Sequence, residues 1–387
     1  MNKISVVTGT RAEYGLLSNL IKLISADKNF NLQLIVTGSH LAKKHGNTIK
    51  EIQKDKIHIS ERISILKNSD SPMDILSATS NAIIKIGSSL KKFSPEAIII
   101  LGDRFEILGA AISAQFLRIP IIHFHGGERT EGVIDEAIRH SITKMSALHF
   151  VANEIYKKRV IQLGENKKNI FNVGGMGIDV IKKTTLIKKE KLEKELKLVF
   201  YKKIFVITFH PVTLENNSSE LQFSNLLKVL NRYKDVSLIF TSPNSDMNNR
   251  IIFKLITKFM KKNPNASFHE SLGRKKYYSL LKICDLVIGN SSSGIIEVPY
   301  FRKPTINIGD RQNGRLKSSS IIDCKTSKKS LQDSIKLALS KKFLDKCRKN
   351  TNYYGTGGAS LKSFNIIKKR INNLTVKKSF NDIDFKI

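Results

Sequence analysis

Short apolar runs, each ended by glycine or polar residues, recur along most of the chain, and segments with helical spacing separate them. Such uninterrupted apolar strands are typical of a parallel sheet that helices cover on both faces. Because parallel neighbours need a crossover, the pattern predicts right-handed βαβ units and a doubly wound α/β sheet. In the first half of the chain, the runs lie at 4–9, 32–38, 97–103, 119–127, 148–153 and 169–175.

The alternation is interrupted once and then resumes. Residues 180–200 are rich in lysine and glutamate and predict a helix. Apolar runs return at 204–211, 236–243, 266–272, 286–290, 304–310 and 319–324. A chain of 387 residues also exceeds what one core usually supports. We therefore predict two Rossmann-like domains, at 1–176 and 177–357, and a C-terminal helix and tail at 358–387 that could pack back on the first domain.

Composition excludes several classes of protein. A hydrophobic share of 41% suits a globular chain, and no apolar run approaches the roughly 18 residues of a membrane span, so we expect no membrane insertion. The N-terminus shows no signal-peptide pattern. The cysteines, Cys284, Cys324 and Cys347, form no close pair, which argues against a disulfide framework or a zinc site. We expect a cytoplasmic protein.

The net charge of +33, from 66 Lys and Arg against 33 Asp and Glu, would suit a protein that binds a polyanion. The lysines, however, are spread along the whole chain in pairs such as Lys43-Lys44 and Lys202-Lys203. A solvated lysine-rich surface is therefore the favoured interpretation, with a polyanion-binding protein as the alternative. We expect no nucleic acid partner, although an anionic small substrate would be attracted to such a field.

Most unusual polar clusters directly follow the predicted strands. In open α/β sheets, ligands bind outside the carboxyl ends of the strands. Two domains that each carry such an edge predict a cleft with ligand groups from both sides. The clusters lie at 8–11, 37–40, 102–104, 125–128, 210–211, 243–244, 289–294 and 309–315.

Two clusters have the character of anion sites. Arg11 follows the first strand and opens a helix, where it could bind a phosphate or simply pair with Glu13. The stretch fits neither a dinucleotide fingerprint nor a P-loop. In the second domain, Ser291 and Ser292 stand at a helix start that could hold a diphosphate, and the alternative is plain N-capping.

Further polar side chains suit a nucleotide in the same domain. Glu297, one turn into that helix, could accept two ribose hydroxyls. Arg311 follows another strand, and an arginine fork suits phosphate, although surface arginines are common in a basic protein. His210 also ends a predicted strand. A lone histidine is more often structural than catalytic, but His210 belongs to this set of strand ends.

Carboxylates gather on the first domain. Asp103 directly follows an apolar strand and either caps the next helix or serves as an acid or base. Glu128 lies at the neighbouring strand end, and Asp135 follows it. Asp135 and Arg139 stand four residues apart, so a surface ion pair is the alternative for them. Several carboxylates opposite a diphosphate pocket predict acid/base chemistry at the anomeric C–O bond of a nucleotide sugar.

Histidines also occur in this stretch. His123 and His125 stand two residues apart and are predicted to share one face of a strand. No further ligand stands at metal-binding spacing, so we expect no metal site.

The motifs as a set resemble the hydrolysing UDP-N-acetylglucosamine 2-epimerases of sialic acid biosynthesis, especially the bacterial capsule type. The resemblance covers residues 4 to about 325. The motifs that show the resemblance are, in chain order, VTGTRAEYG, VTGSHL, HGNT, LGDRFE, HGGE, DEAIRHSITKMS, FHPVT, IGNSSSGIIEVP and INIGDRQNGR. It implies a GT-B fold, a homo-oligomer, no cofactor, and conversion of UDP-N-acetylglucosamine and water to N-acetylmannosamine and UDP through 2-acetamidoglucal.

The resemblance also implies roles for individual residues. The acid/base carboxylates would be Asp103, Glu128 and Asp135, with His210 assisting near the diphosphate. The contacts to UDP would be Arg11, Ala12, Arg104, Asn244, Ser291, Ser292, Glu297 and Arg311.

Two enzymatic alternatives stay open. One is a sister epimerase that acts on UDP-2,4-diacetamido-2,4,6-trideoxyglucose and supplies a legionaminic-type acid. The other is a glycosyltransferase on the same scaffold, which the rich acidic cluster at 128–136 disfavours.

Overall fold

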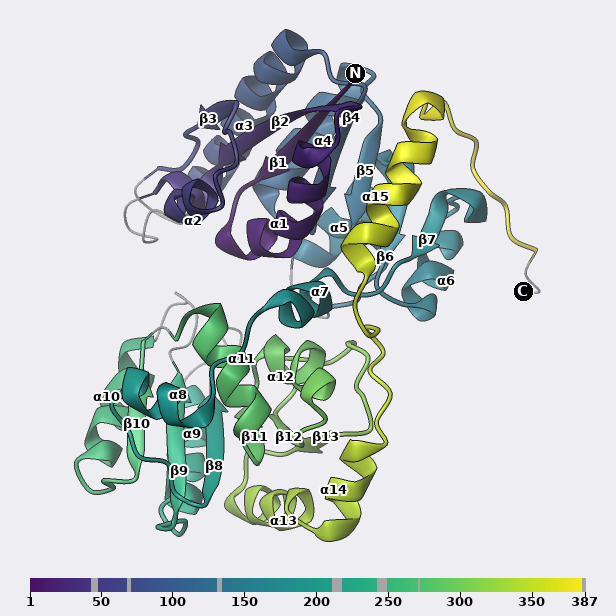
Figure 1. Ribbon diagram of the computed structural model, residues 1–387. Coiled ribbons are helices and arrows are strands. Elements are labelled where there is room, and N and C mark those ends of the chain that lie inside the picture. The colour runs from purple at the N-terminus through teal and green to yellow at the C-terminus, as the bar shows by residue number, and fades with distance from the viewer. Residues whose placement is uncertain are drawn as a thin grey trace. The chain divides into compact units, whose positions relative to one another are not determined.

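The computed structural model describes residues 1–42, 48–67, 71–130, 134–210, 218–241, 249–270 and 272–384. The chain forms two compact units, one made of Met1–Val180 with Tyr354–Ile387 and the other of Ile181–Tyr353 (Figure 1). Each unit contains one parallel sheet flanked by helices. The predicted pair of doubly wound α/β sheets is therefore confirmed.

The first sheet has the strand order β3-β2-β1-β4-β5-β6-β7, and all its strand pairs are parallel. The order reverses between β1 and β4, which makes their carboxyl ends a switch point where ligands commonly bind. Strand β3 was not predicted from the sequence, because its three residues form no apolar run. The strands are β1 (Asn2–Thr8), β2 (Phe30–Thr37), β3 (Glu61–Ile63), β4 (Ala97–Leu101), β5 (Ile121–Phe124), β6 (Leu148–Val151) and β7 (Ile170–Asn172).

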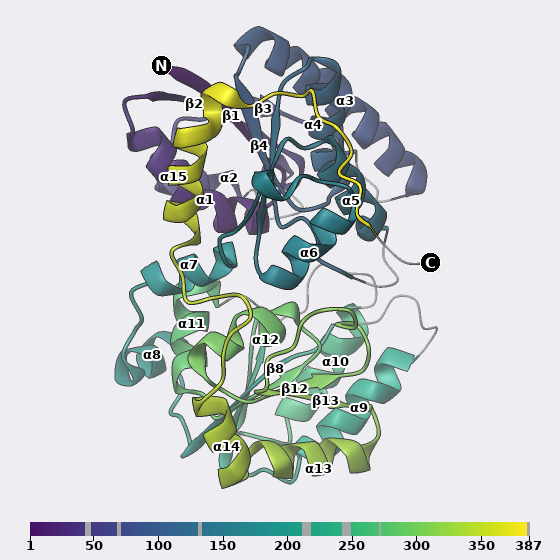
Figure 2. The same ribbon diagram turned by 90° about the vertical axis from the view of Figure 1, so that its right-hand side faces the viewer.

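Helices cover both faces of this sheet. Helices α1 (Arg11–Ala26) and α15 (Ala359–Arg370) pack side by side on one face, and α3 (Pro72–Phe93), α4 (Phe105–Phe116) and α5 (Asp135–Met145) lie on the other (Figure 2). Val6 belongs to the core under α1, whereas its neighbour Val7 belongs to the core under α3 and α4. Burial on both faces explains the uninterrupted apolar runs. The other α-helices of this unit are α2 (Ile49–Lys54) and α6 (Glu154–Gln162), and α7 (Met176–Lys183) begins in this unit and ends in the second.

A side-chain cap joins α7 to α15. Gly358 precedes α15 with φ 95° and has no side chain to cap the helix. Asp179 on α7 takes that role, because its carboxylate accepts from the backbone N–H of Gly358, of Ala359 at 2.9 Å and of Ser360 at 2.5 Å. Residues distant in sequence thus satisfy the first amides of α15.

The second sheet has the order β10-β9-β8-β11-β12-β13. The single helix predicted over 180–200 is wrong, because α7 ends at Lys183 and α8 begins at Lys189. Thr184 and Thr185, both β-branched with low helix propensity, lie at the break. The strands are β8 (Lys203–Thr208), β9 (Val236–Thr241), β10 (Ala266–His269), β11 (Leu286–Gly289), β12 (Thr305–Ile308) and β13 (Ile321–Cys324). The helices are α8 (Lys189–Leu196), α9 (Ser218–Leu230), α10 (Asn249–Met260), α11 (Gly273–Ile283), α12 (Ser292–Ile296), α13 (Lys328–Ala338) and α14 (Lys341–Arg348).

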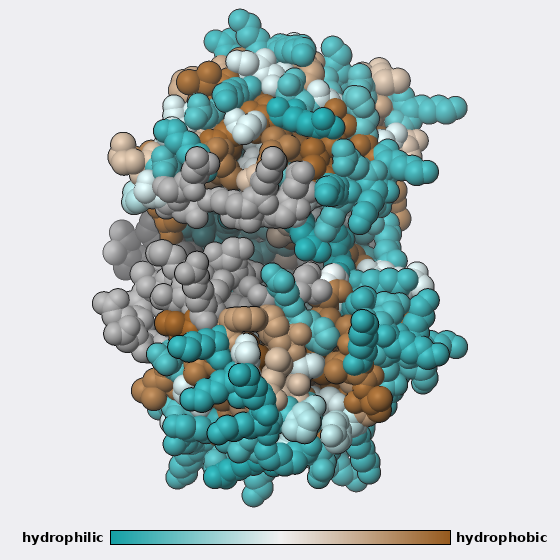
Figure 3. Space-filling view, turned by 90° about the vertical axis from the view of Figure 1, so that its left-hand side faces the viewer, coloured by the Kyte–Doolittle hydropathy of each residue, from teal (hydrophilic) through white to brown (hydrophobic). Residues whose placement is uncertain are grey.

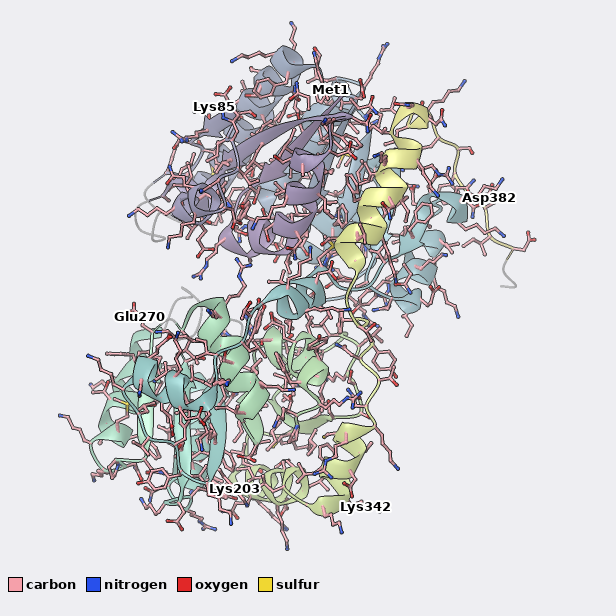
Figure 4. All side chains as sticks on the ribbon, viewed as in Figure 1. Met1, Lys85, Lys203, Glu270, Lys342 and Asp382 are labelled. Carbon is pink, nitrogen blue, oxygen red and sulfur yellow. The ribbon has the colours of Figure 1, made fainter. Side chains whose placement is uncertain are left out.

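Hydrophilic residues cover most of the described surface on the face shown in Figure 3. Lys85, Lys203 and Lys342, labelled in Figure 4, are exposed and come from well separated parts of the chain. Among the helices that the structure describes, none combines the length and the apolar character that crossing a membrane requires.

Candidate active site

The predicted site residues of the first unit lie where β1, β4 and β5 end. Parallel strands end at one edge of a sheet, so the turns after them are neighbours. Asp103 and Arg104 connect β4 to α4, Glu128 lies in the turn after β5, and Asp135 begins α5. Arg11 begins α1 after β1. The fold therefore brings these side chains to the same edge.

Arg139 on α5 is the centre of this edge and is 3% exposed. Its Nε donates to Asp103 Oδ2 at 2.8 Å, and Nη2 donates to the same oxygen. Nη1 donates to the Glu128 carbonyl and to Glu136 Oε2, both at 2.8 Å. One buried guanidinium thus fixes a carboxylate after β4, the turn after β5 and the start of α5.

Sequence reasoning missed this role, because it treated Arg139 only as a surface partner of Asp135. Instead, Arg139 pairs with Asp103 and Glu136. The available signal was its spacing, since Arg139, Ile142 and Thr143 share the buried face of α5. An arginine on an apolar helix face needs buried acceptors.

Asp103 does not show the capping geometry that the sequence left open. The N-cap residue of α4 is Arg104, which makes no side-chain cap bond.

Burial and the nearby Asp103 carboxylate raise the pKa of Asp135, against the opposing charges of Arg104 and Arg139. Asp135 therefore retains a proton more readily than an ordinary aspartate and is suited to proton donation.

Glu128 is 7% exposed and is held by a histidine. His125 Nδ1 lies 2.7 Å from Glu128 Oε1.

The prediction that His123 and His125 share a strand face is wrong, because β5 ends at Phe124 and His125 has a left-handed φ of 68°. His123 instead donates from Nε2 to the Gly102 carbonyl at 2.9 Å, and burial lowers its pKa to about 3. His123 is therefore a neutral, structural histidine.

The nucleotide contacts predicted in this unit lie at the starts of α1 and α4. Arg11 pairs with Glu51 at 2.7 Å, rather than with Glu13 as the sequence alternative had it. Ala12 is exposed in the first turn of α1. Arg104 donates from Nε to Glu106 Oε1 at 2.8 Å, and its side chain is 46% exposed. Both arginines thus remain partly open to solvent.

Asn290 organises the corresponding edge of the second unit. Its Oδ1 accepts from the His210 backbone N–H at 2.7 Å, and its Nδ2 donates to the His210 carbonyl at 2.8 Å. Arg311 Nη1 donates to the Asn290 carbonyl at 3.1 Å. From the sequence, Asn290 was interpreted only as the end of a strand. Its hydrogen bonds to both His210 and Arg311 were not predicted.

His210 itself is buried, and its pKa is lowered to about 3 by burial and then by the charge of Arg311. It is neutral at physiological pH and can serve as a hydrogen-bonding group. Strand β11, which leads into Asn290, ends at Gly289 with φ 144°, where a Cβ would lie 1.8 Å from the Thr208 carbonyl oxygen. Only glycine allows this close approach of β11 to β8.

The serine cluster begins α12. Ser291 is the N-cap residue but makes no side-chain cap bond within the described part of the chain. Ser293 Oγ donates to Glu297 Oε2 at 2.5 Å, and the Tyr278 hydroxyl donates to Glu297 Oε1 at 2.9 Å. Burial raises the pKa of Glu297. Its carboxylate is held in place and each oxygen retains further acceptor capacity.

Asn244 lies outside the described residues. Within the described ranges, no group of three His, Cys, Asp or Glu side chains is arranged to hold a metal ion.

The chain is an α/β protein with polar side chains at the strand ends of both sheets, and comparison with known proteins identifies its family. The model of the UDP-N-acetylglucosamine 2-epimerase family matches residues 22–368. The chain belongs to this family of hydrolysing epimerases.

Individual relatives agree with this assignment. The chain is 44% identical over 322 residues to a GDP/UDP-N,N'-diacetylbacillosamine 2-epimerase (hydrolyzing) of Campylobacter jejuni, which covers 83% of the chain and 84% of the relative. It is 38% identical over 385 residues to the polysialic acid biosynthesis protein P7 of Escherichia coli, covering 99% and 98%. The crystal structure of the Neisseria meningitidis UDP-GlcNAc 2-epimerase bound to UDP-GlcNAc has a TM-score of 0.82 at 19% identity, covering 95% and 100%. The predicted GT-B fold is therefore confirmed.

Proposed function

We propose that the chain is a hydrolysing 2-epimerase that converts UDP-N-acetylglucosamine and water to N-acetylmannosamine and UDP in sialic acid biosynthesis. The observation that carries the proposal is the carboxylate edge built around Arg139, in a chain of this family. An epimerisation at C2 needs groups that remove and return a carbon-bound proton, and several fixed carboxylates suit this task.

The reaction has two stages. A carboxylate removes the proton from C2, the C1–O bond breaks, and its electron pair leaves with the diphosphate oxygen of UDP. The product is 2-acetamidoglucal, whose C1–C2 double bond then takes a proton at C2 on the opposite face. A water oxygen bonds to C1, and the proton that this water loses passes to a carboxylate. Asp103, Glu128 and Asp135 are the proposed acid/base groups. The raised pKa of Asp135 suits it to donate a proton.

The proposed UDP site uses the other predicted residues. His210, which is neutral, would assist the departing diphosphate by hydrogen bonding. Glu297 would accept the ribose hydroxyls. The other proposed contacts to UDP are Arg11, Ala12, Arg104, Asn244, Ser291, Ser292 and Arg311.

A second candidate substrate is UDP-N,N'-diacetylbacillosamine, the 2,4-diacetamido sugar that the sequence left open. The 44% identical Campylobacter relative, which is named for this sugar, favours it. Both candidates share the bonds that react at C1 and C2 and differ at C4 and C6, so the same carboxylates would serve either one.

Proton NMR in deuterated water tests the proposal with each UDP sugar in turn. Formation of UDP and of a 2-epimerised sugar with deuterium at C2 would support it and identify the substrate. Release of UDP with a sugar that retains its configuration and its C2 proton would instead indicate simple hydrolysis. Absence of turnover with both sugars, and with their GDP-linked forms, would contradict the proposal.

Ser292→Ala combined with Arg311→Ala is expected to weaken UDP binding by about 150-fold or more. Hydrogen bonds to a charged partner contribute about 1.5–3 kcal/mol each, and the double variant removes two phosphate donors. Isothermal titration calorimetry with UDP provides the measurement. Ser319→Ala with Arg348→Ala is the matched control, since both side chains are exposed in the same unit. Unchanged affinity in the test variant would contradict the phosphate assignment.

A further inference from the structure

Two buried carboxylates lie beneath the turn between β1 and α1, and the proposed chemistry uses neither of them. Glu13 on α1 is 5% exposed and Glu106 on α4 is fully buried. Glu13 Oε2 accepts from the Gly9 backbone N–H at 2.7 Å. Glu106 packs against the same residue, because a Cβ on Gly9 would lie 2.6 Å from Glu106 Oε1. Both carboxyl groups therefore contact one glycine.

In the part of the chain that the structure describes, each carboxyl group has one oxygen without a hydrogen-bond partner. Glu13 Oε1 and Glu106 Oε2 are buried, and neither has a hydrogen-bond partner among the described residues. Two buried carboxylates this close to each other repel if both are ionised. A proton on one of them removes the repulsion.

Arg104 is the cation that faces the pair. Its Nε donates to Glu106 Oε1, while nearly half of its side chain remains exposed at the carboxyl edge of the sheet. Of the other groups around the turn, His40 donates its backbone N–H to the Gly9 carbonyl at 3.3 Å. Burial lowers the pKa of His40 to about 4, so it is neutral at higher pH. One arginine therefore balances one of the two carboxylates.

We propose that Glu13 stays protonated beside the Glu106–Arg104 ion pair, that Glu13 and Glu106 together position Arg104 for the anionic nucleotide, and that loss of the Glu13 proton weakens UDP binding. The inference rests on the proposed function, because it takes Arg104 as a UDP contact. Glu106 and Glu13 are positioning residues that act through Arg104. When the Glu13 proton leaves, a second negative charge stays under the β1–α1 turn and competes with the nucleotide for the arginine.

The raised pKa of Glu13 supports the presence of a proton on this carboxyl group. Burial, and then the charge of Glu106, raise it from 4.5 to about 8. The folded chain therefore holds this proton over a range where the unfolded chain has released it. As a result, Glu13 lowers the free energy of unfolding progressively as pH rises from about 4.5 to about 8.

The first measurement is the affinity for UDP by calorimetry, from below to above the Glu13 pKa of about 8. In the unaltered chain, affinity is expected to fall about tenfold, the order expected for one charge roughly 10 Å from the ligand in protein. Glu13→Gln resembles the protonated acid and can still accept from Gly9, so its affinity should change less than about twofold. Glu193→Gln is the matched control, because Glu193 also accepts a backbone N–H, that of Phe200 at 2.8 Å, but lies in the second unit.

The second measurement is the urea midpoint of unfolding over the pH range from 4.5 to 8, without nucleotide. The unaltered chain should lose more stability across this range than Glu13→Gln does. If Glu13→Gln does not fold, Glu106→Gln replaces it and should move the alkaline fall in UDP affinity to lower pH. Equal pH dependence of the midpoint in the variant and in the unaltered chain would overturn the proposal that Glu13 is protonated.

The two measurements separate the possible failures. If the midpoints differ but UDP affinity is independent of pH, the pair exists without acting on the nucleotide, and the proposed coupling is wrong. If the unaltered chain binds no UDP at any pH, the proposed function fails, while the midpoints still test the pair.

Discussion

Asp103→Asn is expected to reduce turnover by about three to four orders of magnitude, the upper range for removal of a general acid or base. Asparagine keeps an oxygen that can accept from Arg139, so the buried guanidinium retains a partner. What the variant loses is the negative charge and the ability to take a proton. Affinity for UDP should stay within about threefold, because Asp103 lies among the proposed proton-transfer groups rather than the phosphate donors.

The measurement is UDP release at saturating substrate, with calorimetry for UDP affinity. Asp345→Asn serves as the control, since this aspartate pairs with Arg348 in an exposed i,i+3 ion pair of the second unit. Turnover above about a tenth of the unaltered rate would rule out Asp103 as an essential acid or base.

Arg139→Met is expected to cost about 3–5 kcal/mol of unfolding free energy, as found when one partner of a buried ion pair is removed. Methionine fills a similar volume but leaves Asp103, Glu136 and the Glu128 carbonyl without the donor they share. Arg139→Lys keeps the charge but cannot span the same acceptors, since an ammonium lacks the planar fork. We expect this variant to fold and to lose about 100-fold in turnover through misplaced carboxylates.

Urea unfolding of each variant, followed by the turnover of the folded ones, gives the comparison. Arg348→Met is the matched control, because an exposed pair contributes about 1 kcal/mol or less. An Arg139→Met chain as stable as this control would mean that Arg139 does not hold the edge together. Full turnover in Arg139→Lys would show that its fork geometry is not required.

The sheets could be predicted because their strands are buried on both faces. Neighbours such as Val6 and Val7 enter different cores, which produces a run with no polar interruption. The edge strand β3 lacks that signal and was missed. The strand-end clusters could be recognised for a related reason, since polar residues directly after a buried strand have few structural uses other than turns and sites.

The links between the clusters could not be predicted, because they depend on contacts between elements distant in sequence. Spacing placed Arg139 opposite Asp135, but only the packing of α5 against the sheet brings it to Asp103. In the same way, alternation placed His125 on a strand face, and its left-handed backbone shows that the chain has already turned. Such tertiary contacts leave no local pattern.

The cap that Asp179 provides for α15 has a consequence for how this chain is made. Helix α15 supplies Phe364 and Ile367 to the core under α1, yet it is synthesised after the whole of the second unit. A growing chain can complete Ile181–Tyr353 while the first unit still exposes the apolar face of α1. Synthesis of the first unit therefore starts before that of the second unit and is completed after it. A premature stop before α15 would leave that face of α1 open to aggregation, even though every strand of both sheets had been translated.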